Sequence, residues 1–331
     1  MNLDFSLLAP ELALVIAAIV LILADLLIKR KGELPVIALL GIIVSGLLAL
    51  SQAGGGKSFS GMLLADSFAI FFKILFLSAA GLVVLSSIDY VRKMSRFQGE
   101  YYALLLFATL GMMLMASTGE LVSIYISLEL ASLSLYALSG LLKDPKSNEA
   151  SLKYLLLGAM ASAVLLYGMA LIFGLTGKTQ LGDIADALKK MGLAGLMSRP
   201  ALMVGMVMLA AGFGFKIASV PFQMWVPDVY EGAPTPVTAF LSVASKSAGF
   251  AVILRVFFIV FGWSTDMSSS WGILFAVLSA LSMTAGNIIA ISQGNIKRMM
   301  GYSSIAQAGY LMVGLAAVGL AGPKESPAIS S

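Results

Sequence analysis

The fold is decided by residues 207–258, which read VMLAAGFGFKIASVPFQMWVPDVYEGAPTPVTAFLSVASKSAGFAVILRVFF. Two lysines, Lys216 and Lys246, lie deep inside apolar sequence on either side of a proline-rich break. An ammonium group in hydrocarbon costs about 2.5–3.5 kcal/mol on insertion scales, so chains rarely keep one there without a use. The usual use is to move or sense charge across a membrane. This stretch therefore predicts a membrane protein that carries charge.

The composition of the whole chain agrees with a membrane protein. Of its 331 residues, 59% are hydrophobic and only 11% are charged, whereas soluble domains carry about 25% charged residues. The net charge of +4 is spread over short loops. No basic block offers a surface to a nucleic acid, so we expect no nucleic-acid partner. The absence of cysteine and histidine excludes iron–sulfur clusters and histidine-ligated haem, so any redox cofactor must lie on another chain.

Apolar runs long enough to cross a bilayer as helices, roughly 20 residues each, occur about ten times. They lie near residues 7–28, 34–52, 67–88, 101–118, 121–142, 153–175, 201–220, 235–261, 271–291 and 302–321. The first run is not a cleavable signal peptide, because Asp4 and Glu11 stand where a basic segment would be needed. We therefore predict an all-α polytopic membrane protein with about ten transmembrane helices.

The charges of the loops predict the orientation of these helices. Lysines and arginines gather at residues 29–31, 92–96, 143–146 and 297–298, which fall on one side if every helix crosses once. The positive-inside rule then places the N-terminus outside. The longer loop on the opposite side contains QLGDIADALKKMGL, residues 180–193, with apolar residues at helical spacing. It is either a helix lying flat on the outer interface or an ordinary surface helix.

Several ionisable residues lie within the predicted helices. Glu129 is in the middle of the fifth helix, and with Lys216 and Lys246 it can form pairs that make or break contact. Such a pair has a switchable proton affinity, as a proton relay requires. The alternative is a static ion pair that only fixes helix packing. Lys153 either snorkels at the inner face or connects the relay to that side, and we expect Lys73 to snorkel.

The break after Lys216 is a second sign of a transport site. It contains four prolines, Pro221, Pro227, Pro234 and Pro236. Proline removes a backbone donor and clashes with the preceding turn, so the seventh helix cannot run straight through. Broken helices near the midplane of a membrane mark ion sites in many transporters. The alternative is an inner loop in which Trp225 and Tyr230 anchor the chain at the membrane interface. We expect both to hold, with a loop on the inner side whose edge dips toward Lys216.

The stretch PFQMWVPDVYEGAPTPVTAFLSVASK, residues 221–246, resembles the signature of the antiporter-like membrane subunits of respiratory complex I. Within that group, PDVYEGAPTP and SLELASLSLYALSGLLKDPKSNEASLKYLLLGA look most like the subunit N family of bacterial NADH–quinone oxidoreductase, the counterpart of mitochondrial subunit 2. GNIKRMMGYSSIAQAGYLMVGLAA, residues 294–317, also fits. The resemblance covers essentially the whole chain.

This resemblance implies a particular domain organisation. The family's fold is a bundle of about fourteen helices that contains two inverted five-helix repeats. For this chain it implies a three-helix segment at 1–100, a first repeat with a broken helix at 101–262, the start of a second repeat at 263–321, and a polar tail at 322–331. The second repeat is incomplete, so we expect either a fragment or further helices on another chain.

The resemblance also implies the site. The family's proton-channel residues match Glu129, Lys216 and Lys246, and a lysine of its sixth helix is similar to Lys153. This chain departs from the pattern at Gln223, where many relatives have histidine. If that histidine conducts protons, this chain must use water instead. The family's charged residue in a broken twelfth helix falls beyond the end of the chain.

The function that the resemblance implies is that of a proton-translocating subunit of an NADH–quinone oxidoreductase. Quinone reduction in partner subunits would drive proton transfer through the Glu/Lys relay, with no redox catalysis on this chain. NADH, flavin, iron–sulfur clusters and quinone are expected on the partners, which are other membrane and peripheral subunits of complex I. The chain itself is expected in the lipid bilayer of the cell's inner (plasma) membrane.

Two alternatives remain open. The first is a subunit of a multisubunit cation/proton antiporter, which shares this ancestry and would work without NADH. The second is a purely structural membrane subunit whose charges only fix helix packing.

Overall fold

A computed structural model describes residues 4–28, 31–52, 54–94, 96–192 and 200–322 of the chain. Within these residues, ten helical segments are long and apolar enough to cross a membrane, which confirms the predicted spans. They are Phe5–Leu27, Lys31–Ser51, Ser67–Arg92, Gln98–Ser117, Leu121–Ser139, Pro145–Thr176, Pro200–Ile217, Thr235–Phe261, Thr265–Ile291 and Ile296–Ala321. The chain is a multi-pass membrane protein. Of the predicted polar tail, residues 323–331 lie outside the described part.

The chain divides into two compact units, and each is described by itself. The first consists of Met1–Thr118, Ser123–Leu155 and Gly232–Ala248. The second consists of Gly119–Val122, Leu156–Glu231 and Gly249–Ser331. The repeat boundaries expected after residues 100 and 262 stay predictions, because compactness does not reveal internal repeats.

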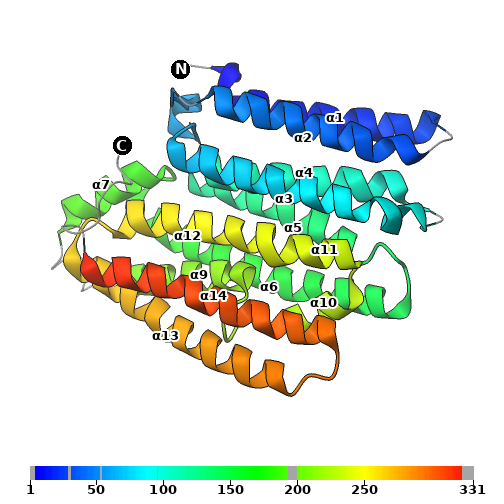
Figure 1. The fold of residues 1–331 in the computed structure, drawn as a ribbon. Helices are drawn as coiled ribbons and strands as arrows, with labels where there is room; N and C mark the ends of the chain where they lie inside the picture. The colour runs from blue at the N-terminus through cyan, green and yellow to red at the C-terminus, as the bar shows by residue number, and fades with distance from the viewer. Residues whose placement is uncertain (1–3, 29–30, 53, 95, 193–199, 323–331) are drawn as a thin grey trace. The chain divides into compact units, whose positions relative to one another are not determined.

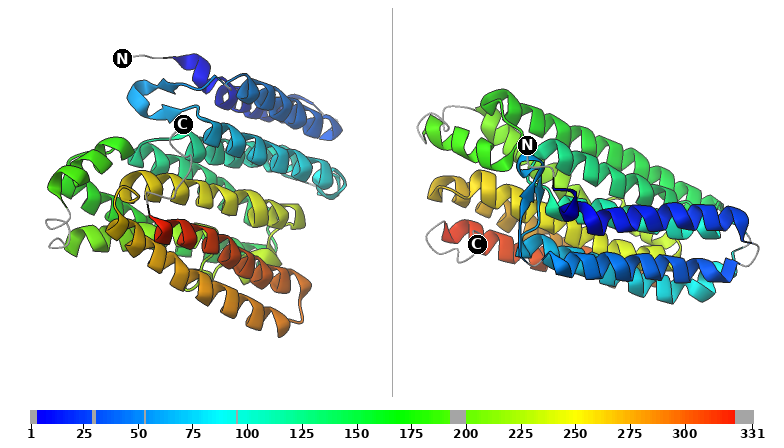
Figure 2. Two further views of the ribbon diagram at one scale, coloured as in Figure 1. Left: turned by 60° about the vertical axis from the view of Figure 1, so that its left-hand side comes forward. Right: turned by 90° about the horizontal axis from the view of Figure 1, so that it is seen from above.

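The first unit begins with a bundle of four helices. Its early elements are η1 (Phe5–Leu8), α1 (Ala9–Leu27), η2 (Lys31–Glu33), α2 (Leu34–Ser51), β1 (Lys57–Ser58), η3 (Phe59–Gly61), β2 (Leu63–Leu64), α3 (Ser67–Arg92) and α4 (Gln98–Ser117). Helix α1 packs against α2 and α4, and α3 packs against the same two helices (Figure 1). The short antiparallel hairpin of β1 and β2 lies where α1 begins, as the view from above in Figure 2 shows.

The remaining elements of the first unit carry the ionisable residues of interest. They are most of α5 (Leu121–Ser139), the start of α6 (Pro145–Thr176), α11 (Thr235–Phe240), the π-helical turn η4 (Leu241–Ser245) and the start of α12 (Lys246–Phe261). Both α11 and η4 pack on α3. The transmembrane helices are apolar on all sides, as expected of helices that face either lipid or one another. Polar residues cap helix ends; for example, Asp66 Oδ1 accepts a hydrogen bond from Ala69 N at 2.7 Å and caps the N-terminus of α3.

The second unit contains the break and a tight helical hairpin. Its elements are the rest of α6 and α12, α7 (Leu181–Met191), α9 (Pro200–Ile217), α10 (Val226–Gly232), α13 (Thr265–Ile291) and α14 (Ile296–Ala321). Helices α13 and α14 run side by side, as the left view of Figure 2 shows. Ser279 Oγ on α13 donates a hydrogen bond to Gly309 O on α14 at 2.7 Å. This bond fixes the two helices in contact.

The loop helix predicted at 180–193 is confirmed as α7. Its apolar residues Ile184 and Leu188 are both 0% exposed, so this face is covered by protein. The ordinary surface helix is therefore the better of the two interpretations. Leu193 lies outside the described residues.

The expectation that Lys73 snorkels to the membrane surface is wrong. Its side chain is 0% exposed, and its Nζ lies 2.9 Å from Glu11 Oε1 on α1. The ammonium group has a carboxylate within reach inside the bundle, so it has no need to reach water.

Candidate functional site

The break in the seventh span is a well-formed helix end. Helix α9 ends at Ile217, and Ala218 adopts a left-handed conformation with φ of +61°. Ala218 N donates to Phe215 O at 3.1 Å, and Ser219 N donates to Gly214 O at 2.9 Å. These two bonds form the Schellman motif, which satisfies carbonyls that a helix end would leave open. The backbone can therefore leave the helix at membrane depth without losing its hydrogen bonds.

The structure gives the four prolines of the break two different roles. Pro221 lies in the non-helical segment between α9 and α10. Pro227 is in the first turn of α10, Pro234 is the N-cap of α11, and Pro236 is in the first turn of α11. A proline in the first turn of a helix loses no intrahelical hydrogen bond, because its missing N–H would have had no partner there. Three of the prolines thus start new helices after the break.

Lys216 lies in the last turn of α9 and is 2% exposed. A positive charge is favourable there, because the helix macrodipole is negative at its C-terminal end. Gly249 of α12 lies directly behind it: a Cβ at Gly249 would be 2.6 Å from Ile217 Cγ2 and 3.3 Å from Lys216 Cγ. Only glycine lets the two helices approach this closely. Gly249 therefore sets where the buried Lys216 lies.

Trp225 and Tyr230 are internal, so the alternative in which they anchor the chain at the membrane interface is wrong. Each is 1% exposed. Trp225 Nε1 donates to Phe215 O at 3.0 Å, which ties the break back to the end of α9. Tyr230 accepts a hydrogen bond from Ser304 Oγ at 3.2 Å. Burial raises the pKa of Tyr230, so its phenol stays neutral.

The short helix α10 is held by charges on α14. Arg298 Nη1 lies 2.6 Å from Asp228 Oδ1 and 3.1 Å from Glu231 Oε2. Lys297 Nζ donates to Glu231 O at 3.0 Å. These side chains are only partly buried, so each ion pair by itself stabilises little. Together they fix the chain that follows the break against the first turn of α14.

Lys246 is 5% exposed and begins α12, directly after the π turn η4. Such turns occur frequently at functional sites. The preceding residue, Ser245, has a buried hydroxyl without a hydrogen-bond partner among the described residues. A buried hydroxyl of this kind is usually satisfied by water. We therefore expect a water molecule at the Ser245 hydroxyl, next to Lys246 in the sequence.

Glu129 lies in the middle of α5 and is half-buried. Helix α4 packs very closely against this part of α5: a Cβ at Gly111 of α4 would lie 2.6 Å from Ala131 N and 2.8 Å from Ser127 O. These two backbone atoms flank Glu129 along the helix. Gly111 therefore fixes the turn that carries the carboxylate.

Lys153 is only partly buried. Its Nζ lies 2.7 Å from Glu149 Oε1 one turn earlier in α6, and 43% of its side chain is exposed. Glu129, Lys153 and Lys246 belong to the first unit and Lys216 to the second. The pairing of Glu129 with Lys216 and the relay as a whole stay predictions.

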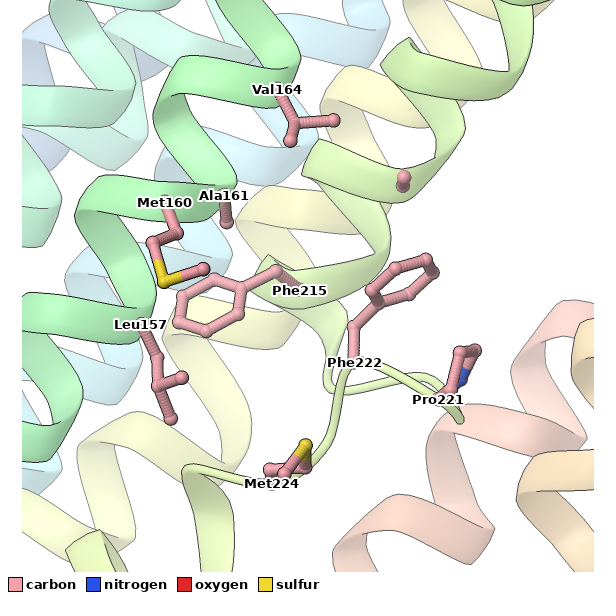
Figure 3. A pocket seen from close by; sticks show the side chains of 9 residues that line it. Leu157, Met160, Ala161, Val164, Phe215, Pro221, Phe222 and Met224 are labelled. Carbon is pink, nitrogen blue, oxygen red and sulfur yellow. The ribbon is translucent and has the colours of Figure 1, made fainter.

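An apolar cavity of about 220 Å³ lies beside the break. It is lined by Leu157, Met160, Ala161, Val164, Ala211, Phe215, Pro221, Phe222 and Met224 (Figure 3). Figure 3 shows Phe215 pointing from α9 toward Met160 and Leu157 on α6. Every lining side chain is apolar, so this cavity suits hydrocarbon and offers no path to an ion.

Gln223, by contrast, provides a polar position within the break. Its Oε1 is buried and has no hydrogen-bond partner among the described residues. A buried amide oxygen is costly unless it is bonded, so we expect a water molecule there. This agrees with the expectation that water replaces the histidine of many relatives. Among the described residues, no group of three or more Asp, Glu, His or Cys side chains could hold a metal ion.

The backbone of Ala218 gives a first testable prediction. A left-handed conformation costs a residue with a side chain about 1–2 kcal/mol, and more when the side chain is β-branched. We expect Ala218→Val to lower the free energy of unfolding by at least this amount, and Ala218→Gly to keep or raise it. Denaturation in mixed micelles followed by tryptophan fluorescence measures both. An equal loss in the two variants would show that the methyl group of Ala218, and not its backbone, is what matters.

Sequence reasoning missed the residues that position the site. Gly111 and Gly249 look like ordinary small residues of apolar helices. In the sequence, Arg298 indicates only the side of the membrane on which its loop lies. A glycine in the middle of an apolar span is a usable signal of close helix contact. Nothing in the sequence indicates which helix it contacts.

Comparisons with known proteins agree on one relationship. A family model described as NADH:quinone oxidoreductase/Mrp antiporter, transmembrane part, matches residues 118–326. Subunit N of NADH-quinone oxidoreductase from Dehalococcoides mccartyi is 49% identical over 314 residues, which cover 94% of this chain and 65% of that protein. The chain thus spans about two thirds of the length of this relative.

Two solved structures share the fold. One is a chain of respiratory complex I from Thermus thermophilus with bound aureothin, with a TM-score of 0.77 and 35% identity over 92% of this chain and 64% of that one. The other is a chain of the membrane-bound sulfane sulfur reductase, an archaeal respiratory membrane complex. Its TM-score is 0.81 at 26% identity, over 95% of this chain and 65% of that one.

Proposed function

Because the chain belongs to the NADH:quinone oxidoreductase/Mrp antiporter membrane family, we propose that it is a proton-translocating membrane subunit of an NADH–quinone oxidoreductase. The observation that carries this proposal is the buried Lys216 in the last turn of a helix that breaks at membrane depth. A charge kept there at such cost is best explained by its use in transport.

The proposed mechanism uses only groups of this chain. Glu129 and Lys216 form a pair whose contact is made or broken, and the change passes a proton to or from Lys246. Lys153 connects the relay to the inner side. The water positions expected at Ser245 Oγ and Gln223 Oε1 support proton transfer, since each buried oxygen has no partner among the described residues. Gly111 and Gly249 hold Glu129 and Lys216 in place.

The driving force is proposed to come from other subunits. Quinone reduction on partner chains, which carry NADH, flavin, iron–sulfur clusters and quinone, displaces charge along the membrane and switches the Glu129–Lys216 pair. This chain performs no redox chemistry of its own. Its partners are other membrane and peripheral subunits of the complex.

We also propose that the chain lies in the inner membrane of the cell with its N-terminus outside. The argument is the gathering of lysine and arginine on one side of the spans. Two of those residues, at positions 29 and 30, lie outside the described part of the structure.

The test of the proposed function is a set of charge-removing variants in the intact complex. Lys216→Ala, Lys246→Met and Glu129→Gln should each reduce proton translocation per electron to near background in membrane vesicles. The reason is that removing one titratable group interrupts the relay. The measured quantity is the rate of internal acidification divided by the rate of quinone reduction.

A matched control separates this effect from a general loss of charge. Arg92 forms an exposed ion pair with Asp89 at the end of α3, with 74% of its side chain exposed. Arg92→Gln should leave the ratio unchanged. A normal ratio in both Lys216→Ala and Glu129→Gln would falsify the relay, and loss of the assembled complex instead would favour a structural subunit.

The cation/proton antiporter is the weaker alternative. The family description includes Mrp antiporters, but the 49% identity to a subunit N favours the oxidoreductase. Sodium-dependent proton exchange in vesicles without any electron donor would reverse this preference.

A further inference from the structure

Glu11, Lys73 and Gln52 form a buried polar cluster that the proposed relay does not use. They lie on α1, on α3 and directly after α2, and they are 2%, 0% and 9% exposed. The match to the family model begins at residue 118, so none of the three lies within it. The cluster belongs entirely to the first unit. It is built from the three helices that precede the expected repeats.

Lys73 contacts two acceptors of different kinds. Its Nζ lies 2.9 Å from Glu11 Oε1 and donates to Gln52 Oε1 at 3.3 Å. Gln52 is itself fixed, because its Nε2 donates to Ser6 O at 3.1 Å and Leu7 O at 2.9 Å. One acceptor of the ammonium group can therefore take a proton, and the other cannot.

The second oxygen of Glu11 is the unusual atom of the cluster. Both oxygens of Glu11 are buried without a hydrogen-bond partner among the described residues; Oε1 lies 2.9 Å from the Lys73 ammonium, and Oε2 is the oxygen for which no such contact is seen. A carboxylate that served only as a static ion-pair partner would be expected to have both oxygens satisfied, because an unbonded charged oxygen is expensive to bury. Oε2 is thus left open to a proton or to a water molecule that delivers one.

We propose that this cluster is a second proton-binding site of the chain, with Glu11 Oε2 as the atom that takes the proton. Binding forms an O–H bond at Oε2 with a proton from the aqueous phase, and release returns it there. Lys73 stays an ammonium throughout and keeps Gln52 Oε1 as its acceptor when the carboxylate becomes neutral. The cluster then alternates between a net charge of zero and +1. No other reactant is needed.

Glu11 lies near the end of the helices at which the chain has exposed polar residues. Glu11 is in the first turn of α1, and the preceding Asp4 and Ser6 are exposed at that end of the helices. The hairpin there carries the exposed Lys57, and α3 begins after the half-buried Asp66. The segments of α2, α11 and η4 contain no charged residue.

The other titratable side chains of α1, α3 and α4 lie at the opposite end of these helices. They are Asp25, Asp89, Tyr90, Arg92, Glu100, Tyr101 and Tyr102. Asp4, Lys57 and Asp66 lie at the end of α1 and α3 at which Glu11 would exchange its proton.

Infrared spectroscopy of the full chain in lipid nanodiscs tests the proposal. On acidification the protonated Glu11 should add one carboxylic-acid carbonyl band, which shifts in deuterium oxide, and Glu11→Gln should lose that band. Gln52→Leu removes the acceptor that binds the Lys73 ammonium when Glu11 is neutral. In this variant the carboxylic-acid band of Glu11 should therefore appear only at lower pH. Asp25→Asn is the matched control, since Asp25 lies on the same helix in a more exposed pair with Lys31. It should keep the band.

The proposal is overturned if the acid-induced difference spectra of the wild type and of Glu11→Gln are the same at every pH at which the chain keeps its helical circular dichroism. Glu11 and Lys73 would then be a static ion pair. Repeating the titration with Glu129→Gln separates this site from the relay. The Glu11 band should persist there even if the proposed function fails.

Discussion

Replacing Lys73 by methionine is expected to lower the free energy of unfolding by about 3–5 kcal/mol, because it leaves the buried carboxylate of Glu11 without its cation. Methionine has a length close to that of lysine and keeps the packing of the aliphatic stem. The loss therefore reports the charge and not a cavity. Denaturant titration in mixed micelles, followed by tryptophan fluorescence, measures it.

A double variant makes this prediction specific. In Lys73→Met with Glu11→Leu, both charges are removed, and most of the lost stability should return, since apolar replacements of a buried ion pair are often neutral. The half-buried pair of Lys31 and Asp25 provides the comparison, and Lys31→Met should cost less than Lys73→Met, about 1 kcal/mol. If Lys73→Met is as mild as Lys31→Met, Lys73 reaches water in the membrane as a snorkelling side chain would.

The second large effect is expected at Gly111. Any side chain there would meet Ala131 N and Ser127 O, two backbone atoms that cannot rotate away. We expect Gly111→Val to force α4 from α5 and to cost about 1–3 kcal/mol, as overpacking in a well-packed core does. The same unfolding titration measures it.

Gly174 of α6 is the matched control for Gly111, because a Cβ there would have nothing within 4 Å. Gly174→Val should change stability only slightly. If Gly111→Val is equally mild, the contact between α4 and α5 is looser than described. If the folded Gly111→Val protein also transfers fewer protons per electron, the displaced turn of Glu129 accounts for the loss.

The sequence predicts the spans and the break well, because both are local properties. Length and hydropathy identify a membrane helix without reference to its neighbours. A run of prolines after Lys216 prevents one continuous helix wherever the segment lies. The helix at α7 was also visible, since its apolar residues repeat at helical spacing.

The sequence-based predictions that were wrong all concern whether a side chain contacts lipid, water or another part of the protein. Lys73 early in an apolar helix looks the same whether it reaches lipid headgroups or pairs with Glu11, which is distant in the sequence. Trp225 and Tyr230 near helix ends likewise look the same whether they face the membrane interface or protein. The relay residues Glu129, Lys216 and Lys246 were selected by resemblance and by the cost of burying charge. Their mutual contacts stay predictions.

The π turn that precedes Lys246 makes the length of this span adjustable. A π turn contains one residue more than the α-helical turn it replaces, so the helix can lose a residue there and remain continuous. Because the extra residue is accommodated within the turn itself, such a deletion would leave the direction in which Lys246 points relative to α11 nearly unchanged. A lineage can thus lose one residue from this span and keep both the lysine and its direction.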